Sequence, residues 1–196
     1  MTDIETPPSA RKTQLLDLAY AYVLAHGLGE LSLRPLATAI GSSPRVLLFL
    51  FGSKEALIRA LLARARADEL AMLEGGTDRR AAPGGLAAMT EQVWSWLARP
   101  EHRTLLGLWL EAYARSLVDP AGPWARFASD TVADWLAVLG AAQPPAVRRT
   151  RAGRAERTLA LAVLRGNLLD LLASGDVERT TAAVHAALPL LGRAPY

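Results

Sequence analysis

The sequence predicts an all-α protein, and three observations support that fold class. Alanine and leucine dominate, residues branched at the β-carbon are sparse, and no alternation of apolar and polar residues is long enough for a strand. Hydrophobic residues make up 51% of the 196 residues and charged residues 21%, enough apolar surface for a packed core. We expect about nine helices, in an N-terminal three-helix domain over residues 1–52 and a C-terminal helical domain over residues 53–196.

The first helix is predicted over residues 10–26, after a mobile arm over residues 1–9 that contains two prolines. A left-handed glycine followed by an apolar residue, here Gly27 and Leu28, is typical of a Schellman-type helix end. Apolar residues at helical spacing predict one buried face, made of Leu15, Leu18, Ala19, Tyr22 and Val23.

Two short helices are then expected over about 33–40 and 44–51, separated by a tight turn. Serines are expected to cap their starts and glycines to end them, namely Ser32, Gly41, Ser43, Gly52 and, for a fourth helix reaching about residue 73, Ser53. This is the pattern of a helix-turn-helix, whose second helix enters the DNA major groove. From spacing alone, an ordinary helical hairpin within a core remains the alternative.

The remaining chain predicts five more helices and one flexible loop. The loop is rich in glycine and lies at residues 75–85. Proline- and glycine-containing breaks separate the helices, which are expected over about 86–98, 101–118 or 103–118, 124–139, 148–173 and 176–191.

Contacts with DNA must be argued from the placement of charge, because the formal net charge is only +3 and residues 1–55 hold five basic and five acidic residues. Arg45 begins the predicted recognition helix, and Lys54 lies beside the free N–H groups at the start of the fourth helix. Serine hydroxyls in the turn could bond phosphate oxygens. The candidate DNA-binding residues are Arg34, Ser42, Ser43, Arg45, Val46, Leu48, Phe49 and Lys54.

The apolar run at residues 46–51 exceeds what one core face can absorb. Val46, Leu48 or Phe49 could contact thymine methyl groups in the major groove. The other hypothesis is that this surface contacts a protein.

Residues 11–57 resemble the N-terminal domain of the TetR-type (tetracycline-repressor) family of transcriptional regulators. The resemblance depends on Gly27, Leu36-Ala37, Ile40, Gly41-Ser42-Ser43, Leu47, Phe51 and Ser53-Lys54-Glu55-Ala56-Leu57. Leu48 stands where the family usually has tyrosine, and Leu50 where it often has a polar residue or histidine. The resemblance implies a homodimeric repressor that binds a palindromic double-stranded operator and responds to a small-molecule effector.

The family places its effector pocket in the middle helices, where all five tryptophans of this chain fall. As a cluster, aromatic side chains with a few polar groups are typical of a ligand pocket, although core filling is the better explanation of any one aromatic residue. The candidate ligand-binding residues are Trp94, Trp109, Glu111, Tyr113, Trp124, Phe127, Trp135 and Asn167.

The last two helices contain more apolar surface than one chain's core requires, and in the resembled family this pair forms a four-helix dimer interface. The candidate interface residues are Leu164, Leu168, Leu171, Val184 and Leu188. Five arginines at positions 148–157 predict a solvated helix start, with a second nucleic-acid site as the alternative.

Catalysis finds no support in the sequence, because metalloprotease, phosphate-loop, esterase and dinucleotide motifs are lacking. We therefore expect no enzyme activity, no metal and no cofactor. Cysteine is absent, and neither a secretory leader nor a transmembrane run is found, which predicts a cytoplasmic protein without a membrane partner. The alternative function is a helical ligand-sensing module that acts through protein partners without sequence-specific DNA binding.

Overall fold

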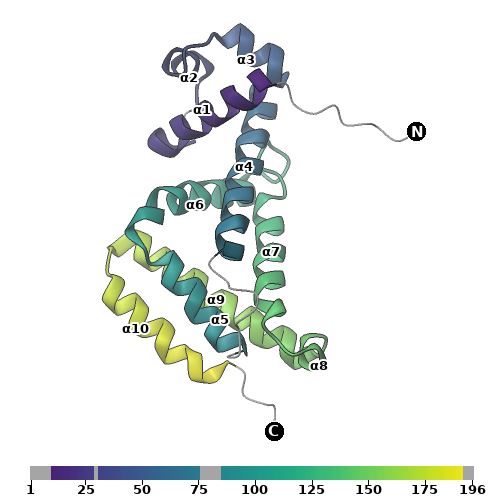
Figure 1. Ribbon diagram of the computed structural model, residues 1–196, viewed down its shortest axis with the longest axis vertical. Coiled ribbons are helices and arrows are strands. Elements are labelled where there is room, and N and C mark those ends of the chain that lie inside the picture. The colour runs from purple at the N-terminus through teal and green to yellow at the C-terminus, as the bar shows by residue number, and fades with distance from the viewer. Residues whose placement is uncertain (1–9, 29–30, 76–84, 192–196) are drawn as a thin grey trace, which may run out of the picture. The chain divides into compact units, whose positions relative to one another are not determined.

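The computed structural model describes residues 10–28, 31–75 and 85–191, and every regular element within these ranges is a helix (Figure 1). Two 3₁₀ helices, Pro100–His102 and Leu188–Leu190, accompany the α-helices. In chain order the α-helices are α1 (Ala10–His26), α2 (Leu33–Ala39), α3 (Pro44–Phe51), α4 (Lys54–Gly75), α5 (Gly85–Leu97), α6 (Arg103–Val118), α7 (Phe127–Ala141), α8 (Pro145–Arg148), α9 (Arg151–Ser174) and α10 (Val177–Ala187). The predicted arm at residues 1–9 and most of the predicted loop at 75–85 lie outside the described residues.

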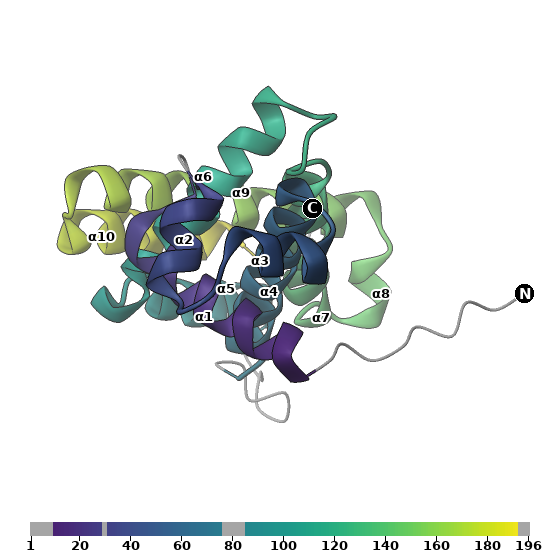
Figure 2. The same ribbon diagram turned by 90° about the horizontal axis from the view of Figure 1, so that it is seen from above.

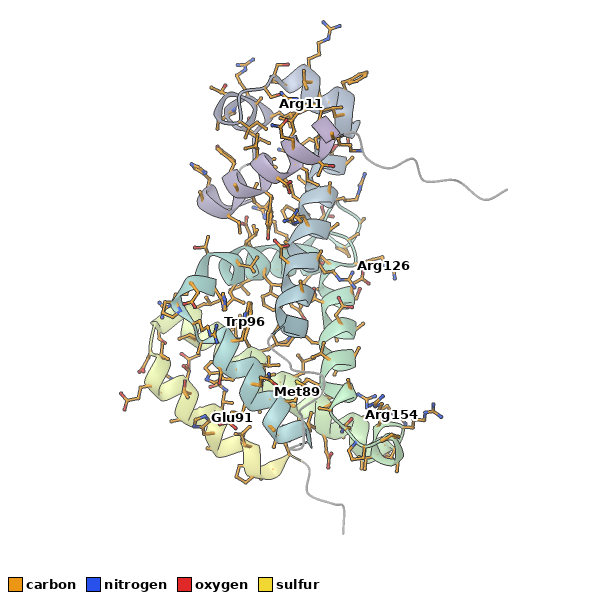
Figure 3. The ribbon with its side chains drawn as sticks, in the orientation of Figure 1. Arg11, Met89, Glu91, Trp96, Arg126 and Arg154 are labelled. Carbon is orange, nitrogen blue, oxygen red and sulfur yellow. The ribbon has the colours of Figure 1, made fainter. Side chains whose placement is uncertain are left out.

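The all-α prediction is confirmed, with one helix more than expected in the described ranges. The additional helix is α8, a single turn within a segment predicted to be a break. Helix α7 begins three residues later than predicted, because turns extend up to Arg126, a non-glycine residue with φ of +67° (Figure 3). None of the described helices is both long and apolar enough to cross a lipid bilayer.

The chain packs as two compact units, each formed from segments distant in sequence. Residues 1–66 and 108–128 make the first unit, and residues 67–107 and 129–196 the second. These units, defined by packing, differ from the predicted DNA-binding and C-terminal domains, whose boundary is expected after residue 52. Helices α4, α6 and α7 each contribute residues to both units.

The core of the first unit forms around α1, whose buried face differs partly from the prediction. Leu15, Ala19 and Val23 are fully buried, as their spacing predicts. Leu18 is exposed instead of buried, whereas Tyr20, which the prediction left out, is buried.

In the second unit, α5, α9 and α10 pack against one another, and α9 and α10 lie side by side in both views (Figures 1 and 2). A glycine turn joins α9 to α10, because Gly175 takes the left-handed conformation with φ of +73°. The indole Nε1 of Trp94 in α5 donates to Thr181 Oγ1 in α10 over 2.9 Å. Two residues further along α5, the Trp96 ring stacks on His102 with centroids 4.0 Å apart.

Candidate functional site

The helix-turn-helix consists of α2, a glycine turn and α3, and the end of α2 fixes the turn. Ser42 N–H donates to the Ala37 carbonyl over 2.8 Å, and Gly41 N–H to the Thr38 carbonyl over 3.3 Å. These two bonds, with φ of +63° at Gly41, make a Schellman motif. The direction in which the chain enters α3 is therefore set by backbone hydrogen bonds.

Helix α3 starts as its sequence predicts. Ser43 has an extended backbone and its Oγ accepts from Val46 N–H over 3.3 Å, while Pro44 occupies the first helical position. The corresponding prediction for α2 is only partly correct. Ser32 has the extended backbone of an N-cap, but its side chain makes no capping hydrogen bond.

Helix α3 presents two different faces. Leu47 and Phe51 are buried. The opposite face is exposed and holds Arg45, Leu48 and Phe49, at i, i+3 and i+4. The side chain of Phe49 is 86% exposed, an unfavourable environment for a large apolar group unless a partner covers it.

Contacts around α1 hold the helix-turn-helix in place. The Lys12 ammonium lies 5.4 Å from the centroid of the Phe51 ring, which links α1 to α3. Arg64 of α4 pairs with Asp17 of α1 at 2.7 Å. Both partners of this ion pair are largely solvent-exposed, so it contributes at most about 1 kcal/mol.

The structure places most of the predicted DNA-binding residues on the surface of the first unit. Arg34, Arg45 and Lys54 are exposed, as phosphate contact requires. Ser42 is the exception, because its Oγ is buried within the turn without a hydrogen-bond partner. A phosphate contact by Ser42 would require this hydroxyl to become accessible, and it stays a prediction.

Two residues connect α3 to α4. Gly52 has φ of +85°, and Ser53 Oγ accepts from Ala56 N–H over 3.1 Å, which caps α4 as predicted. Hydrogen bonds from its own backbone N–H and from the Ser53 side chain lower the pKa of the Glu55 carboxyl. Glu55, next to Lys54, therefore stays ionised. Its negative charge interacts favourably with the positive, N-terminal end of the α4 dipole.

The predicted ligand-binding residues are divided between the two units. Trp109, Glu111, Tyr113, Trp124 and Phe127 belong to the first unit, whereas Trp94, Trp135 and Asn167 belong to the second. All of the tryptophans and the phenylalanine among them are buried, as core packing requires. Their role in binding a ligand stays a prediction.

The polar candidates already have partners within the chain. Asn167 donates to the Val163 carbonyl one turn earlier in its own helix, at 2.8 Å. Glu111 in α6 accepts from Leu28 N–H at 2.8 Å and pairs with Arg115 at 3.2 Å. Both side chains thus already make hydrogen bonds or ion pairs within the chain.

Most of the predicted dimer-interface residues lie in the core of their own chain, and their contact with a second copy stays a prediction. Leu164, Leu168, Leu171 and Val184 are buried within their own chain, because α9 turns this face towards α5 and α10. None of the predicted interface residues lies on the exposed face of α9, whose signal is a run of small and apolar residues at alternating spacings of four and three. Its members are Ala155, Leu159, Ala162, Gly166, Leu169 and Ala173.

The arginine run at positions 148–157 largely satisfies backbone carbonyl groups. Arg148 donates to the carbonyls of Ala141 and Gln143, which closes the segment between α7 and α8. Arg157 donates to the Arg148 carbonyl over 2.7 Å. Arg154 donates to a neighbouring carbonyl and extends away from α9 (Figure 3). These bonds give the run a structural role at the start of α9.

The fold is shared with solved transcriptional regulators, although no family model and no curated protein sequence matches the chain. A Rhodococcus sp. protein assigned to the TetR family of transcriptional regulators superposes with a TM-score of 0.72 at 17% identity, over 93% of this chain and 99% of that one. The multidrug binding protein EbrR in complex with proflavin gives a TM-score of 0.68 at 20% identity, covering 92% and 99%.

A third protein, Salmonella enterica GusR, gives a TM-score of 0.68 at 19% identity, over 97% of this chain and 99% of that one. Nearly the full length of each chain is included in these superpositions, so the likeness concerns both the helix-turn-helix and the C-terminal helices. Because the sequence identities are low, the likeness establishes the fold. The chain has the all-helical fold of the TetR-family transcriptional regulators.

Proposed function

We propose that this protein is a DNA-binding transcriptional regulator, most simply a repressor, that binds a palindromic operator as a homodimer. The observation that carries the proposal is the exposed face of α3, where Arg45, Leu48 and Phe49 project from a helix held by a Schellman turn. A charged group beside apolar ones suits the major groove, where phosphates and thymine methyl groups lie close together. The shared fold supports this reading of the helix pair.

The homodimer is part of the proposal, because a single short recognition helix reads too few bases for strong binding. Two copies related by a two-fold axis reach half-sites about 34 Å apart. The exposed stripe of α9, from Ala155 to Ala173, supplies the contact surface in place of the buried leucines. Small residues at heptad-like spacing allow the helices of two copies to approach closely.

Control by a small-molecule effector completes the proposal. Solved EbrR structures include complexes with proflavin and with imidazole, which shows that a protein of this fold can hold small ring compounds. An effector that binds one conformation of the helical body more tightly would displace α4. Since only Gly52 and Ser53 separate α4 from α3, the recognition helices of the dimer would move and their fit to the operator would weaken.

The test is an electrophoretic mobility shift with the DNA upstream of the chain's own coding region. Binding should weaken steeply as salt rises, and Arg45→Ala should reduce the slope of log K against log salt by about 1. Arg149→Ala is the matched control, because Arg149 is an exposed arginine of the other unit and should leave the slope unchanged. Absence of binding by the wild-type chain at any salt concentration would overturn the proposal.

The effector is sought by thermal unfolding with a panel of small molecules that includes proflavin. A ligand present at 100 times its dissociation constant stabilises the folded state by about 2.7 kcal/mol. The hypothesis of an effector-controlled regulator requires that a stabilising compound also lowers the affinity for DNA.

A further inference from the structure

The C-terminal end of α1 is joined to α6 by a single carboxylate. Glu111 Oε2 accepts from Leu28 N–H over 2.8 Å, across 83 positions of sequence. The sequence predicts a Schellman motif here, in which Leu28 N–H would bond the Val23 carbonyl. That carbonyl instead accepts from Gly27 N–H at 2.8 Å, an αL motif, and Glu111 takes the remaining donor.

The position of this carboxylate is not explained by helix electrostatics. The C-terminus of a helix carries the negative end of its dipole, so a carboxylate there is unfavourable without compensation. Arg115 provides the compensation, because its Nε lies 3.2 Å from Glu111 Oε1. The Arg115 guanidinium in turn lies 5.3 Å from the centroid of Trp124, which follows α6 in the chain.

The second observation is that this part of α6 packs with the DNA-reading helices. Residues 108–128 belong to the first unit with α1, α2 and α3, whereas α6 starts at Arg103, within the second unit. Gly27 lies beside the carboxylate, since a Cβ atom at this position would be in ordinary van der Waals contact with Glu111 Oε2, at 3.5 Å. Helix α6 therefore has residues in both units, and Glu111 lies in the part that packs with α1.

We infer that Glu111 is a positioning residue that holds the C-terminus of α1, and with it the helix-turn-helix, against α6. This inference rests on the proposed function, because its consequence is an effect on DNA affinity. The Glu111 carboxylate accepts a hydrogen bond from the Leu28 N–H, and the ion pair with Arg115 orients that carboxylate. Loss of the bond frees the end of α1 and disperses the orientations of α3.

The experiment compares Glu111→Ala, Glu111→Gln and Arg115→Met in the full-length chain, by amide hydrogen exchange and by the mobility shift. In Glu111→Ala the Leu28 amide should exchange about tenfold faster or more, because a charged acceptor is lost. Glu111→Gln keeps a carbonyl oxygen that can accept the bond, so it should restore most of the protection. Arg115→Met should fall between the two.

The loss of DNA affinity should be largest in Glu111→Ala, intermediate in Arg115→Met and smallest in Glu111→Gln. The slope of log K against log salt should stay unchanged, because no phosphate contact is removed. Asp17→Asn is the matched control. It removes an exposed carboxylate that pairs with Arg64 in the same unit and should leave Leu28 exchange as in the wild type. If Glu111→Ala fails to fold, the comparison of Glu111→Gln with Arg115→Met still ranks the two contacts.

Two results would overturn the inference: unchanged Leu28 exchange in Glu111→Ala, or faster exchange with wild-type DNA affinity. Failure of the wild-type chain to bind DNA would instead remove the proposed function and, with it, the consequence for DNA. The two failures are therefore distinguishable.

Discussion

Gly153 in the first turn of α9 lies directly against the backbone carbonyl of Val147, and a Cβ atom at position 153 would overlap that oxygen. The two nearest atoms, the carbonyl oxygen and the carbonyl carbon of Val147, belong to the backbone and cannot rotate away. Gly153→Ala should therefore destabilise the protein by about 2 kcal/mol, the usual range for forced overpacking. The measurement is urea unfolding followed by circular dichroism.

Gly107→Ala is the matched control, because Gly107 is also helical but nothing approaches its Cβ position within 4 Å. Here alanine should stabilise the protein by about 0.5–1 kcal/mol through helix propensity. A Gly153→Ala variant as stable as the wild type would show that α8 and α9 are not packed as closely as the structure has them.

The Asp170–Arg179 pair predicts an acid-sensitive contribution to stability. Arg179 donates to both oxygens of Asp170, at 2.6 and 2.7 Å, and these hydrogen bonds lower the pKa of Asp170 below its usual value of 3.8. The unfolded state then binds more protons than the folded state as the pH falls through and below this value. The stabilisation is complete above about pH 4 and is lost as the pH falls through the folded-state pKa.

Urea unfolding across about pH 2–6 checks this prediction. The difference in unfolding free energy between the wild type and Asp170→Asn should be largest above about pH 4 and should shrink towards lower pH. Because both side chains are substantially exposed, added salt should reduce the difference. A difference that is independent of pH would contradict an ionised Asp170 as its source.

Local structure was predictable where the signal lies within a few residues. The serine caps of α3 and α4 and the glycine ends of α2 and α3 depend on backbone conformation and on side chains three positions away, so the sequence contains the complete signal. The bond between Glu111 and Leu28 depends on how α6 packs against α1. No local pattern encodes that packing.

The two apolar faces of α9 show a second limit of prediction from the sequence. Helix α9 has apolar residues on two faces, one containing Leu164 and Leu168 and the other Leu159 and Leu169. Periodicity identifies both faces but not which of them packs against the chain's own α5 and α10. Only the tertiary arrangement reveals that the larger leucine cluster is internal.

Phe49 provides a prediction about DNA sequence preference. If its exposed ring contacts a thymine methyl group, Phe49→Ala should lower operator affinity about tenfold, and less on operators in which that thymine is replaced. The salt slope should stay the same, because the phenyl ring contacts no phosphate. Val118→Ala is the control, since Val118 is also 86% exposed and belongs to the same unit, but lies on α6. Equal losses for both variants would show that Phe49 makes no specific contact.

The exposed stripe of α9 predicts where a dimer can be broken without unfolding the chain. Leu159 and Leu169 are 44% and 47% exposed, so a glutamate at either position is hydrated in the monomer but buried beside its own copy in a two-fold contact. Leu159→Glu and Leu169→Glu should therefore shift the protein from dimer to monomer in light scattering while helicity is retained. Leu117→Glu, at a 64% exposed position of α6, should stay dimeric. Monomers should also lose most of their operator affinity, because each retains one recognition helix for two half-sites. A dimer that survives both glutamates would place the contact elsewhere, since a desolvated pair of carboxylates cannot remain in a closely packed seam.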